Sequence, residues 1–330
     1  MSWRWSIGRV ARRLDGRDRR LRRRAAGRPV LALAGIDHGD PFVLRDADRW
    51  FLYHTGASAV PVYESADLRT WTAQGTALDV AGAPPWAACD YWAPEVTCRD
   101  GTFYMYVAAT SRRPGGAPDD GSRRVGVARA ADPLGPFTWD ADPLVTEWSI
   151  DAHPFRDHDG EWWLFYSARN DATRYRDGTI GCGIAVDRLL EPARVAGDPA
   201  VVLVPDRRWE GNQQATWFWN EGPAVTGSGG RYWMFYSGGF YRDRTYAVGL
   251  ATAPHPRGPW TKHPGNPLLV TGRDVLGPGH VCLTSAPDDD RTLVVHHGHM
   301  PGRQDRAVFV DVVEWRGDRI DIEPFEPTVR

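Results

Sequence analysis

The chain has 330 residues, of which 12% are aromatic and 16 are Trp, together with 35 Gly and 26 Pro. This composition excludes a helical bundle and favours a many-stranded all-β protein, because Trp and Tyr suit half-buried pleated surfaces while Gly and Pro end short strands. The formal net charge is only −2, but residues 1–30 contain eleven Arg against Asp15 and Asp18, so this segment carries +9 and the remainder −11.

Residues 1–30 are predicted to form a basic N-terminal extension, partly helical or disordered, ahead of one domain over residues 31–330. An arm that binds nucleic acid is the alternative, but nothing in the segment supports base readout and the acidic remainder would repel phosphates. No apolar segment of an export signal follows Arg12-Arg13, and no stretch approaches the length of a membrane span. We therefore expect no nucleic-acid partner, no membrane span and a cytoplasmic location.

Five units with one order of features follow this extension. Each opens with a polar or charged head residue and a short apolar run, turns at Gly or Asp, and continues into an aromatic-rich run and shorter outer runs. The head residues are Asp40, Glu95, Asp151, Glu221 and His280. Their separations of 55, 56, 70 and 59 residues are close to the repeat length of a four-stranded propeller blade. The longest separation contains an insertion from Trp209 to Asn220.

The outer runs of the first unit are Val60 to Ser65 and a segment that ends at Trp71. Five such units, without a strong helical stretch between them, predict a five-bladed β-propeller of four-stranded antiparallel blades. Radial packing of the blades buries each sheet between its neighbours and leaves few open edges.

The four cysteines, Cys89, Cys98, Cys182 and Cys282, are scattered without a CxxC spacing. Neither a zinc cluster nor a disulfide framework is implied, and buried free thiols are expected. A bridge between Cys89 and Cys98 is the alternative.

The head residues are expected to meet at the propeller axis, because the innermost strand of every blade runs along it. Asp40, Asp151 and Glu221 would face one another across a pocket, and Glu95 and His280 would complete the ring. Carboxylates gathered in this way repel one another and raise at least one pKa, which a general acid near neutral pH requires. The alternative, that the acids merely cap turns, is weakened by their recurrence in successive units.

Glu210 competes with Glu221 for the fourth head position. The distance to the following aromatic run favours Glu221, which precedes Tyr232 by 11 residues, as Asp151 precedes Trp162. Glu210 is therefore assigned to the inserted loop.

Aromatic side chains near the heads could bind sugar faces. Trp92 lies beside a head motif, and Trp217 and Trp219 lie in the insertion, so these three are the predicted platforms. Each could instead belong to the core.

The head motifs, taken in order, resemble those of glycoside hydrolase family 43 over roughly residues 36 to 316. The motifs are Asp40-Pro41, Trp92-Ala93-Pro94-Glu95, Ile150-Asp151-Ala152-His153, Glu221-Gly222-Pro223 and Gly277-Pro278-Gly279-His280. The resemblance implies an inverting glycosidase acting on arabinose- or xylose-containing glycans. It assigns Asp40 as general base, Asp151 as pKa modulator and orienter, and Glu221 as general acid.

The resemblance also implies that Arg306 contacts the bound sugar and that no cofactor is required. His280 matches the family's central histidine, so a Ca²⁺ or Na⁺ ion on the axis is possible, although one imidazole with mostly water ligands would hold it weakly. Ala152 departs from the Pro that many members have after the blade-three Asp. The expected partner is an oligosaccharide or polysaccharide.

Three readings of the activity stay open. The leading one is an exo-acting α-L-arabinofuranosidase or β-D-xylosidase, because the bulky loop from Trp209 to Asn220 would narrow the pocket mouth. An endo-arabinanase or a related galactosidase is the alternative within the family. A noncatalytic glycan-binding propeller is the alternative of another class, which three retained carboxylate heads make less favourable.

Overall fold

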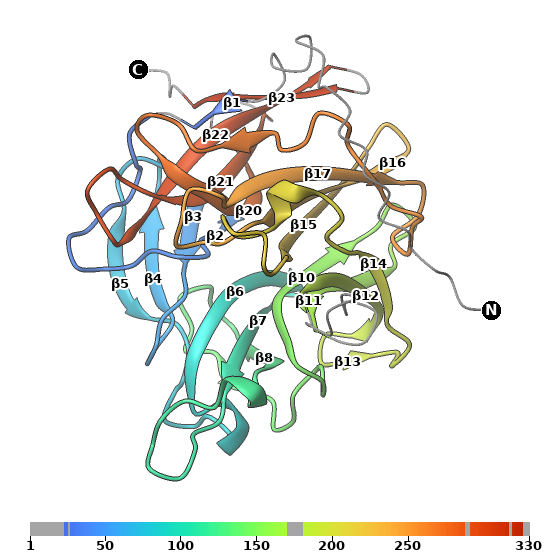
Figure 1. The fold of residues 1–330 in the computed structure, drawn as a ribbon. Helices are drawn as coiled ribbons and strands as arrows, with labels where there is room; N and C mark the ends of the chain where they lie inside the picture. The colour runs from blue at the N-terminus through green and yellow to red at the C-terminus, as the bar shows by residue number, and fades with distance from the viewer. Residues whose placement is uncertain (1–22, 26, 170–180, 288–290, 317–318, 326–330) are drawn as a thin grey trace.

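The computed structural model describes residues 23–25, 27–169, 181–287, 291–316 and 319–325. Within these ranges the strands form five sheets that are arranged as blades around one axis (Figure 1), which confirms the predicted all-β five-bladed propeller. No helix in the described ranges combines the length and the apolar character that crossing a membrane requires.

Each blade is built from consecutive antiparallel strands, with the first strand at the axis and the last at the rim. Blade one consists of β2 (Phe42–Asp46), β3 (Arg49–Tyr53), β4 (Pro61–Ser65) and β5 (Thr72–Thr76). Blade two consists of β6 (Cys89–Arg99), β7 (Thr102–Thr110), β8 (Arg124–Ala130) and β9 (Thr138–Trp139). Blade five consists of β20 (Leu276–Ser285), β21 (Thr292–His299), β22 (Arg306–Arg316) and β23 (Arg319–Pro324).

Blades three and four have more strands than the predicted four. Blade three consists of β10 (Ser149–Arg156), β11 (Trp162–Ala168), β12 (Gly183–Glu191), β13 (Arg194–Val195) and β14 (Ala200–Leu203). Blade four consists of β15 (Asn220–Ser228), β16 (Arg231–Gly238), β17 (Ala247–Ala253), β18 (Thr261–Lys262) and β19 (Leu269–Val270), with β1 (Arg23–Arg24) parallel to β19. Short 3₁₀ turns lie at η2 (Pro85–Ala87), η3 (Asp120–Ser122) and η5 (Arg208–Glu210).

Tight turns between the first two strands fix the register of the inner hairpins. Asp100 and Gly101 both have positive φ, as do Gly229 and Gly230, and each pair joins strands that continue in register on either side. Such two-residue loops match the right-handed twist of the strands and favour Gly and Asp. The predicted turns at Asp100-Gly101 and Gly229-Gly230 are therefore confirmed, whereas the one predicted at residues 288–290 lies outside the described residues.

The fourth strand of blade one lies further along the chain than predicted. It begins at Thr72, directly after the segment ending at Trp71 that was expected to form it. The Asp67 carboxylate accepts hydrogen bonds from the backbone N–H groups of Arg69 and Thr70, and Leu68 has a φ of 59°. A side-chain-bonded turn therefore occupies the segment that looked like a strand.

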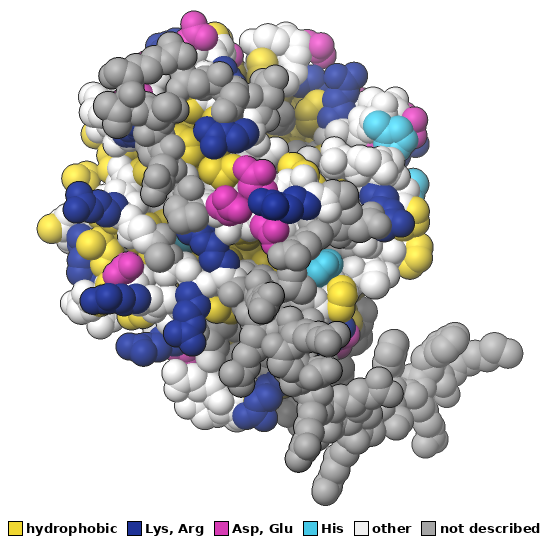
Figure 2. Space-filling model, turned by 90° about the horizontal axis from the view of Figure 1, so that it is seen from above, with side chains coloured by type: hydrophobic (Ala, Val, Ile, Leu, Met, Phe, Trp, Pro, Cys, Tyr) yellow, Lys and Arg dark blue, Asp and Glu magenta, His cyan; other side chains and the backbone are white. Residues whose placement is uncertain are grey.

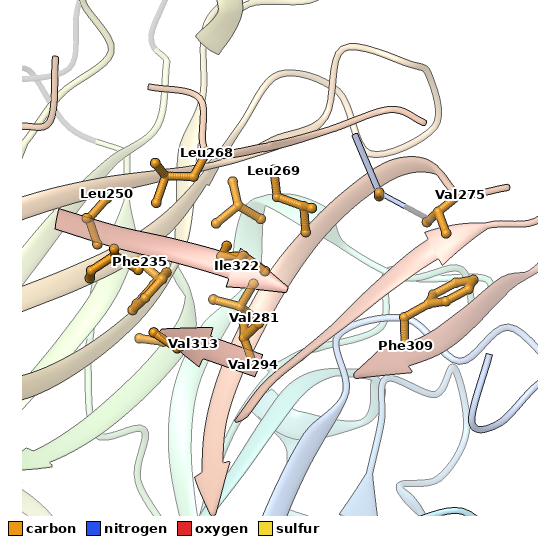
Figure 3. Packing of buried hydrophobic residues seen from close by; sticks show 14 of the residues in the cluster. Phe235, Leu250, Leu268, Leu269, Val275, Val281, Val294, Phe309, Val313 and Ile322 are labelled. Carbon is orange, nitrogen blue, oxygen red and sulfur yellow. The ribbon is translucent and has the colours of Figure 1, made fainter. Parts of the chain in front are cut away.

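Apolar side chains between neighbouring blades form the core. Figure 3 shows the contact between blades four and five, where Phe235 and Leu250 of one blade lie against Val281 and Val313 of the other. All four are less than 5% exposed. Both faces of most blades are thus covered, which explains why the second strands read as nearly continuous apolar runs.

Three of the four cysteines are buried free thiols, as predicted, whereas Cys98 is exposed. Cys89 and Cys98 are both free, so the alternative bridge does not form. The Cys282 sulfur lies 3.2 Å from the backbone nitrogen of Val43, which donates to it across the junction of blades five and one.

The basic segment joins the propeller before the predicted domain boundary at residue 31. Arg23 and Arg24 pair with Leu269 and Val270, and the Arg23 guanidinium lies 2.8 Å from the buried carboxylate of Asp311 in blade five. His296 contacts the other oxygen of Asp311 at 3.2 Å. The described end of the segment therefore ties blade four to blade five.

Replacing Arg23 with Ala should lower the free energy of unfolding, because the buried Asp311 carboxylate would lose its cation. We expect a loss of about 2–4 kcal/mol, less than for a fully isolated charge since His296 remains. Urea unfolding of Arg23→Ala measures it. Arg24→Ala is the matched control: Arg24 is exposed and should change stability by less than about 0.5 kcal/mol. Equal effects would contradict a specific role of the Arg23 pair.

Surface charges of both signs are interspersed. On the face shown in Figure 2, Lys and Arg side chains are spread over the surface among smaller groups of Asp and Glu side chains, with hydrophobic side chains between them.

Candidate active site

Every blade carries at least one residue with positive φ on or just before its inner strand, and one of them in each blade lies at a comparable place near the axis. These residues are Asp40 (56°), Ala93 (46°), Asp151 (56°), Gly222 (56°) and His280 (49°). In β6, β10, β15 and β20 the pairing with the second strand is interrupted at this residue, which is the signature of a β-bulge. Bulges redirect side chains, and here they recur at one level of the propeller axis.

The five predicted head residues do not share one register. Asp40, Asp151 and His280 occupy the positive-φ position itself, whereas Glu221 precedes the positive-φ residue Gly222 by one and Glu95 follows Ala93 by two. The prediction of five equivalent heads is therefore wrong for Glu221 and Glu95. The motif spacing could not reveal this, because a bulge adds a residue without changing the hydrophobic pattern.

Side chains at the ends of the second strands bind the bulge N–H groups of the next blade. The Thr55 hydroxyl accepts from Ala93, the Ser167 hydroxyl from Gly222, the Ser237 hydroxyl from His280 and the His297 Nδ1 from Asp40, at 2.7–3.3 Å. Thr55 and Ser167 also donate to the acid of their own blade, to Asp40 at 2.6 Å and to Asp151 at 3.0 Å. Each of these two hydroxyls thus holds the carboxylate of its own blade and the backbone of the next blade.

The Asp40 carboxylate lies among positive and hydrogen-bonding groups. Arg306 Nη1 donates to its Oδ1 at 3.1 Å, Thr55 donates to its Oδ2, and His280 Nδ1 lies 3.4 Å from Oδ1. Burial alone would raise the pKa of Asp40, but the charge of Arg306, with contributions from His280 and His297, holds it well below the usual value. Asp40 is therefore a carboxylate anion throughout the neutral and mildly acidic range.

Arg306 is fixed by a second carboxylate that the sequence analysis did not single out. Asp37 accepts from Nε and Nη2 of Arg306 in a two-pronged pair, with a shortest distance of 2.7 Å. A methyl group on Gly39 would lie 1.8 Å from the guanidinium carbon, so only Gly lets the side chain pass. Burial would lower the pKa of Arg306, but Asp40 and Asp37 outweigh it and raise the pKa further.

Glu221 lies in an environment opposite to that of Asp40. Burial, followed by the nearby Asp151 carboxylate, raises the pKa of Glu221 well above its usual value. The Tyr246 hydroxyl donates to its Oε1 at 2.6 Å and opposes part of this rise. The Tyr246 ring lies parallel to the His297 ring at 5.5 Å and is held firmly. Of Glu221 and Asp40, Glu221 is thus the carboxyl group whose surroundings favour the protonated form.

Asp151 connects these two groups. Its Oδ2 accepts from the Ser167 hydroxyl and from the backbone N–H of Gly222, both at 3.0 Å. Burial raises the pKa of Asp151, while His280 lowers it and Asp40 raises it. Since the Gly222 N–H belongs to the residue after Glu221, Asp151 fixes the backbone that carries Glu221.

One cavity of about 480 Å³, the central cavity, brings these groups together. Its lining includes Asp40, Asp151, Glu221, His280, Trp92 and Arg306, six of the predicted site residues. Pockets of this size accommodate small ligands, and this one combines an ionised carboxylate with a protonated one.

A second cavity of about 430 Å³, the aromatic cavity, adjoins the central one. It shares Trp92 and Glu221 with the central cavity and is also lined by Trp217 and Trp219. The Trp217 and Trp219 rings meet edge to face at 5.5 Å. All three predicted Trp platforms therefore face cavities, with Glu221 at the boundary between them.

Glu95 does not reach either cavity, contrary to its predicted place in a substrate-binding ring. It is 6% exposed and its carboxylate accepts from His153 Nδ1 at 2.8 Å. His153 Nε2 in turn accepts from the backbone N–H of Val225. Through His153, Glu95 fixes blades two, three and four to one another.

His280 lines the central cavity beside Asp40 and Gly222. Among the described residues, no group of three or more His, Cys, Asp or Glu side chains is suited to hold a metal ion. A cation near His280 would therefore depend mostly on water ligands. The Ca²⁺ or Na⁺ ion at this position stays a prediction.

Glu210 lies in a buried network of one ion pair and several hydrogen bonds. Its carboxylate is fully buried, contacts Lys262 Nζ at 2.5 Å, and accepts from the Tyr236 hydroxyl and from the backbone N–H groups of Asp206 and Arg207. It anchors the inserted loop and lines neither cavity, which agrees with assigning it to the insertion.

Sequence reasoning assigned no role in supporting the acids to six groups: Asp37, Thr55, Ser167, Ser237, Tyr246 and His297. A signal for some of them was present, because Thr55, Ser167, Ser237 and His297 each end the aromatic-rich run of a unit. Their polar character at equivalent positions could have indicated a shared role. Asp37 and Tyr246 lie outside the repeated pattern and gave no such signal.

Comparison with known proteins agrees with this arrangement. The sequence profile of glycosyl hydrolases family 43 matches residues 27–320. An extracellular exo-α-(1→5)-L-arabinofuranosidase of Streptomyces avermitilis is 29% identical over 78% of this chain and 54% of its own length. The enzyme of the same name from Streptomyces chartreusis is 27% identical over 84% of this chain and 89% of its own length.

Solved structures give the same result. The crystal structure of a thermostable family-43 glycoside hydrolase is 32% identical, covers 90% of this chain and 96% of its own, and superposes with a TM-score of 0.77. An α-L-arabinofuranosidase from Lactobacillus brevis, at 19% identity and a TM-score of 0.70 over 89% of this chain and 97% of its own, shares the fold.

The prediction of a cytoplasmic location is wrong in the light of these relatives, two of which are named extracellular enzymes. The prediction used only the lack of an apolar segment after Arg12-Arg13, and those residues lie outside the described part of the chain.

Proposed function

Because the chain belongs to glycosyl hydrolases family 43, we propose that it is an exo-acting enzyme that removes terminal α-L-arabinofuranosyl or β-D-xylosyl units with inversion. Asp40 is the general base, Glu221 the general acid, and Asp151 the group that orients Glu221 and raises its pKa. The substrate is an oligosaccharide or polysaccharide that bears such units.

One observation carries this proposal: the central cavity holds two carboxyl groups whose pKa values are shifted in opposite directions. Arg306 keeps Asp40 ionised, whereas burial and Asp151 keep Glu221 protonated. Pairs of titratable groups driven apart in this way divide the acid and base roles between them. A noncatalytic glycan-binding propeller would not need this division.

The reaction follows from the two protonation states. Asp40 takes a proton from a water molecule while the oxygen of that water forms a bond to the anomeric carbon. Glu221 transfers its proton to the glycosidic oxygen as the bond to the leaving group breaks. Water then enters opposite to the leaving group, which inverts the configuration. We expect the two carboxyl groups to stand about 6.5–9.5 Å apart in the substrate complex, to leave room for that water.

The supporting groups act before the reaction. Ser167 and the Gly222 N–H hold Asp151, which is placed to favour the protonated form of Glu221. Thr55 and Arg306 hold Asp40. Such preorganised partners avoid rearrangement during the chemical step. Arg306 also borders the central cavity, where it can contact a hydroxyl group of the sugar.

The choice of sugar follows the named relatives. The Streptomyces enzymes are named for α-(1→5)-linked arabinofuranose, and a Bacteroides ovatus relative, 27% identical over 69% of each chain, is named a xylosidase/arabinosidase. A β-D-galactofuranosidase of Aspergillus niger is a further relative at 26% identity, over 76% of this chain and 69% of its own. Action outside the cell agrees with the extracellular names and with a polymeric substrate.

A panel of 4-nitrophenyl α-L-arabinofuranoside, β-D-xyloside and β-D-galactofuranoside tests the proposal, with Glu221→Gln as the negative control. We expect release of nitrophenol from the arabinofuranoside or the xyloside by the native protein. If the native protein and Glu221→Gln are equally inert on these and on arabinan and xylan, the enzymatic proposal fails.

The alkaline limb of the pH profile should move in opposite directions in two variants. Tyr246→Phe removes a hydrogen bond that favours ionised Glu221, so the pKa of Glu221 rises and activity persists to higher pH. Asp151→Asn removes a negative charge that favours protonated Glu221, so the pKa of Glu221 falls and the alkaline limb moves to lower pH. We expect shifts of about one pH unit in kcat/KM. Shifts in the same direction would contradict Glu221 as the titrating acid.

A further inference from the structure

A third cavity of about 600 Å³, the arginine cavity, adjoins the central cavity beside Asp37 and Arg306. It is lined by Arg242, Arg244 and Arg303 and shares Asp37, Arg306, Tyr241 and Arg242 with the central cavity. The central cavity therefore adjoins two further cavities, the aromatic cavity and the arginine cavity. Among the described residues, Tyr241 alone lines all three.

The two neighbouring cavities have different relations to the reacting groups. Glu221, the proton donor to the leaving group, lies between the central and aromatic cavities, so the leaving group extends into the aromatic cavity. Asp37 and Arg306 lie between the central and arginine cavities. A glycan that continued beyond the non-reducing end of the bound sugar would enter the arginine cavity.

Tyr241 lies at this second boundary and is supported from several sides. The Arg306 guanidinium lies 5.0 Å from its ring centre, the Phe240 ring meets it edge to face at 5.5 Å, and Arg242 lies over it at 5.1 Å. His299 Nε2 contacts the Tyr241 carbonyl oxygen at 3.0 Å. Packing and hydrogen bonding thus hold the aromatic ring beside the same guanidinium that fixes Asp40.

We propose that the ring of Tyr241 is the wall that closes the central cavity toward the arginine cavity and limits the released unit to one sugar. The inference rests on the proposed function, since it takes the central cavity as the site of the terminal sugar. With the ring removed, the central and arginine cavities join, and a second sugar can bind on the non-reducing side. Tyr241 is then the residue that sets the length of the product.

The exposed side chains of Arg242 and Arg244 would supply hydrogen-bond donors to a second sugar in the joined cavity. The arginine cavity has four Arg side chains against three acids, Asp37, Asp243 and Asp305. Two of the four, Arg306 and Arg303, are paired with Asp37 and Asp305. Within the described part of the chain, Arg242 and Arg244 form no such ion pair, and their N–H groups can donate to hydroxyl oxygens.

The test compares Tyr241→Ala, which removes the ring, with Tyr241→Phe, which keeps it. The substrates are 4-nitrophenyl glycosides of one sugar and of the corresponding disaccharide, prepared for arabinofuranose and for xylose. Mass spectrometry identifies the first sugar released from the disaccharide glycoside. We expect the native protein and Tyr241→Phe to release only the monosaccharide. Tyr241→Ala should release the intact disaccharide and gain about tenfold in its kcat/KM ratio of disaccharide to monosaccharide glycoside.

Monosaccharide as the sole product of an active Tyr241→Ala would overturn the proposal, as would disaccharide release by the native protein. Binding provides a second readout that does not need turnover. In the Glu221→Gln background, calorimetry compares methyl glycosides of the mono- and disaccharide with and without Tyr241→Ala. A gain for the disaccharide alone supports the wall, and equal changes for both overturn it. If the native protein is inert but this gain appears, the proposed catalysis fails while the wall stands.

Discussion

Glu221→Gln should lower kcat on glycosides with poor leaving groups by about 10²–10⁴-fold, because Gln cannot donate the proton that the departing oxygen needs. The loss should shrink as the leaving group becomes more acidic, since a dinitrophenolate departs without protonation. The measurement is kcat for a series of aryl glycosides plotted against the pKa of the leaving phenol. A steep dependence in the variant, where the native enzyme has a shallow one, identifies the general acid.

Glu210→Gln is the matched control for that series. Glu210 is also buried and lies in the neighbouring insertion, but its carboxylate is committed to Lys262 and Tyr236. Its substitution should lower stability and leave the leaving-group dependence shallow. If Glu210→Gln shows the steep dependence and Glu221→Gln does not, the acid has been assigned to the wrong side of the insertion.

Asp40→Asn should be the other severe substitution, with kcat reduced by about 10²–10⁴-fold on every leaving group, because the attacking water loses its base. Azide needs no deprotonation, so it should restore turnover and yield the glycosyl azide with inverted configuration. Thr55→Val serves as the control, since it removes a hydrogen bond to Asp40 while keeping the carboxylate. It should cost far less and gain nothing from azide.

A different azide result would change the role of Asp40. If azide restored Asp40→Asn with retention of configuration, azide would be attacking a glycosyl-enzyme intermediate formed on another residue, and Asp40 would be the acid/base residue of a double-displacement mechanism. If azide had no effect and Asp40→Asn kept most of its activity, another group would supply the base.

The fold could be predicted from the sequence because one pattern of residues recurs in five units of the chain. The blades repeat a turn, a second strand that is aromatic-rich in the first four of them, and a polar residue at the inner strand, and four separations of 55, 56, 70 and 59 residues are hard to satisfy with another architecture. Packing between blades then requires apolar residues on both faces of most second strands, as seen around Phe235 and Val294. The number of blades followed from that repetition, independently of any single motif.

The details that escaped prediction depend on local backbone geometry. Bulges separate Glu95, which does not line the central cavity, and Glu221 from the register of Asp151, although hydrophobic spacing treats the three alike. The turn at Asp67 displaces a strand by hydrogen bonds from one carboxylate. The docking of Arg23 depends on a partner, Asp311, almost 300 residues away in the chain.

The residues of the candidate site also fall into two groups: those that recur in the units and those that depend on contacts across blades. Asp40, Asp151 and Glu221 were found because their residue types recur in the units. The supporting groups Asp37 and Tyr246 were not, because their roles exist only through contacts across blades. Tyr241 likewise attracts notice only once three cavities are seen to share it.

The configuration of the first product, followed by proton NMR in the early minutes of hydrolysis, tests the assignment of Asp40 and Glu221 most directly. With Asp40 activating water and Glu221 donating the proton, the sugar first released must have the anomeric configuration opposite to that of the substrate. Retention of configuration would make Asp40 a nucleophile and contradict the proposed mechanism.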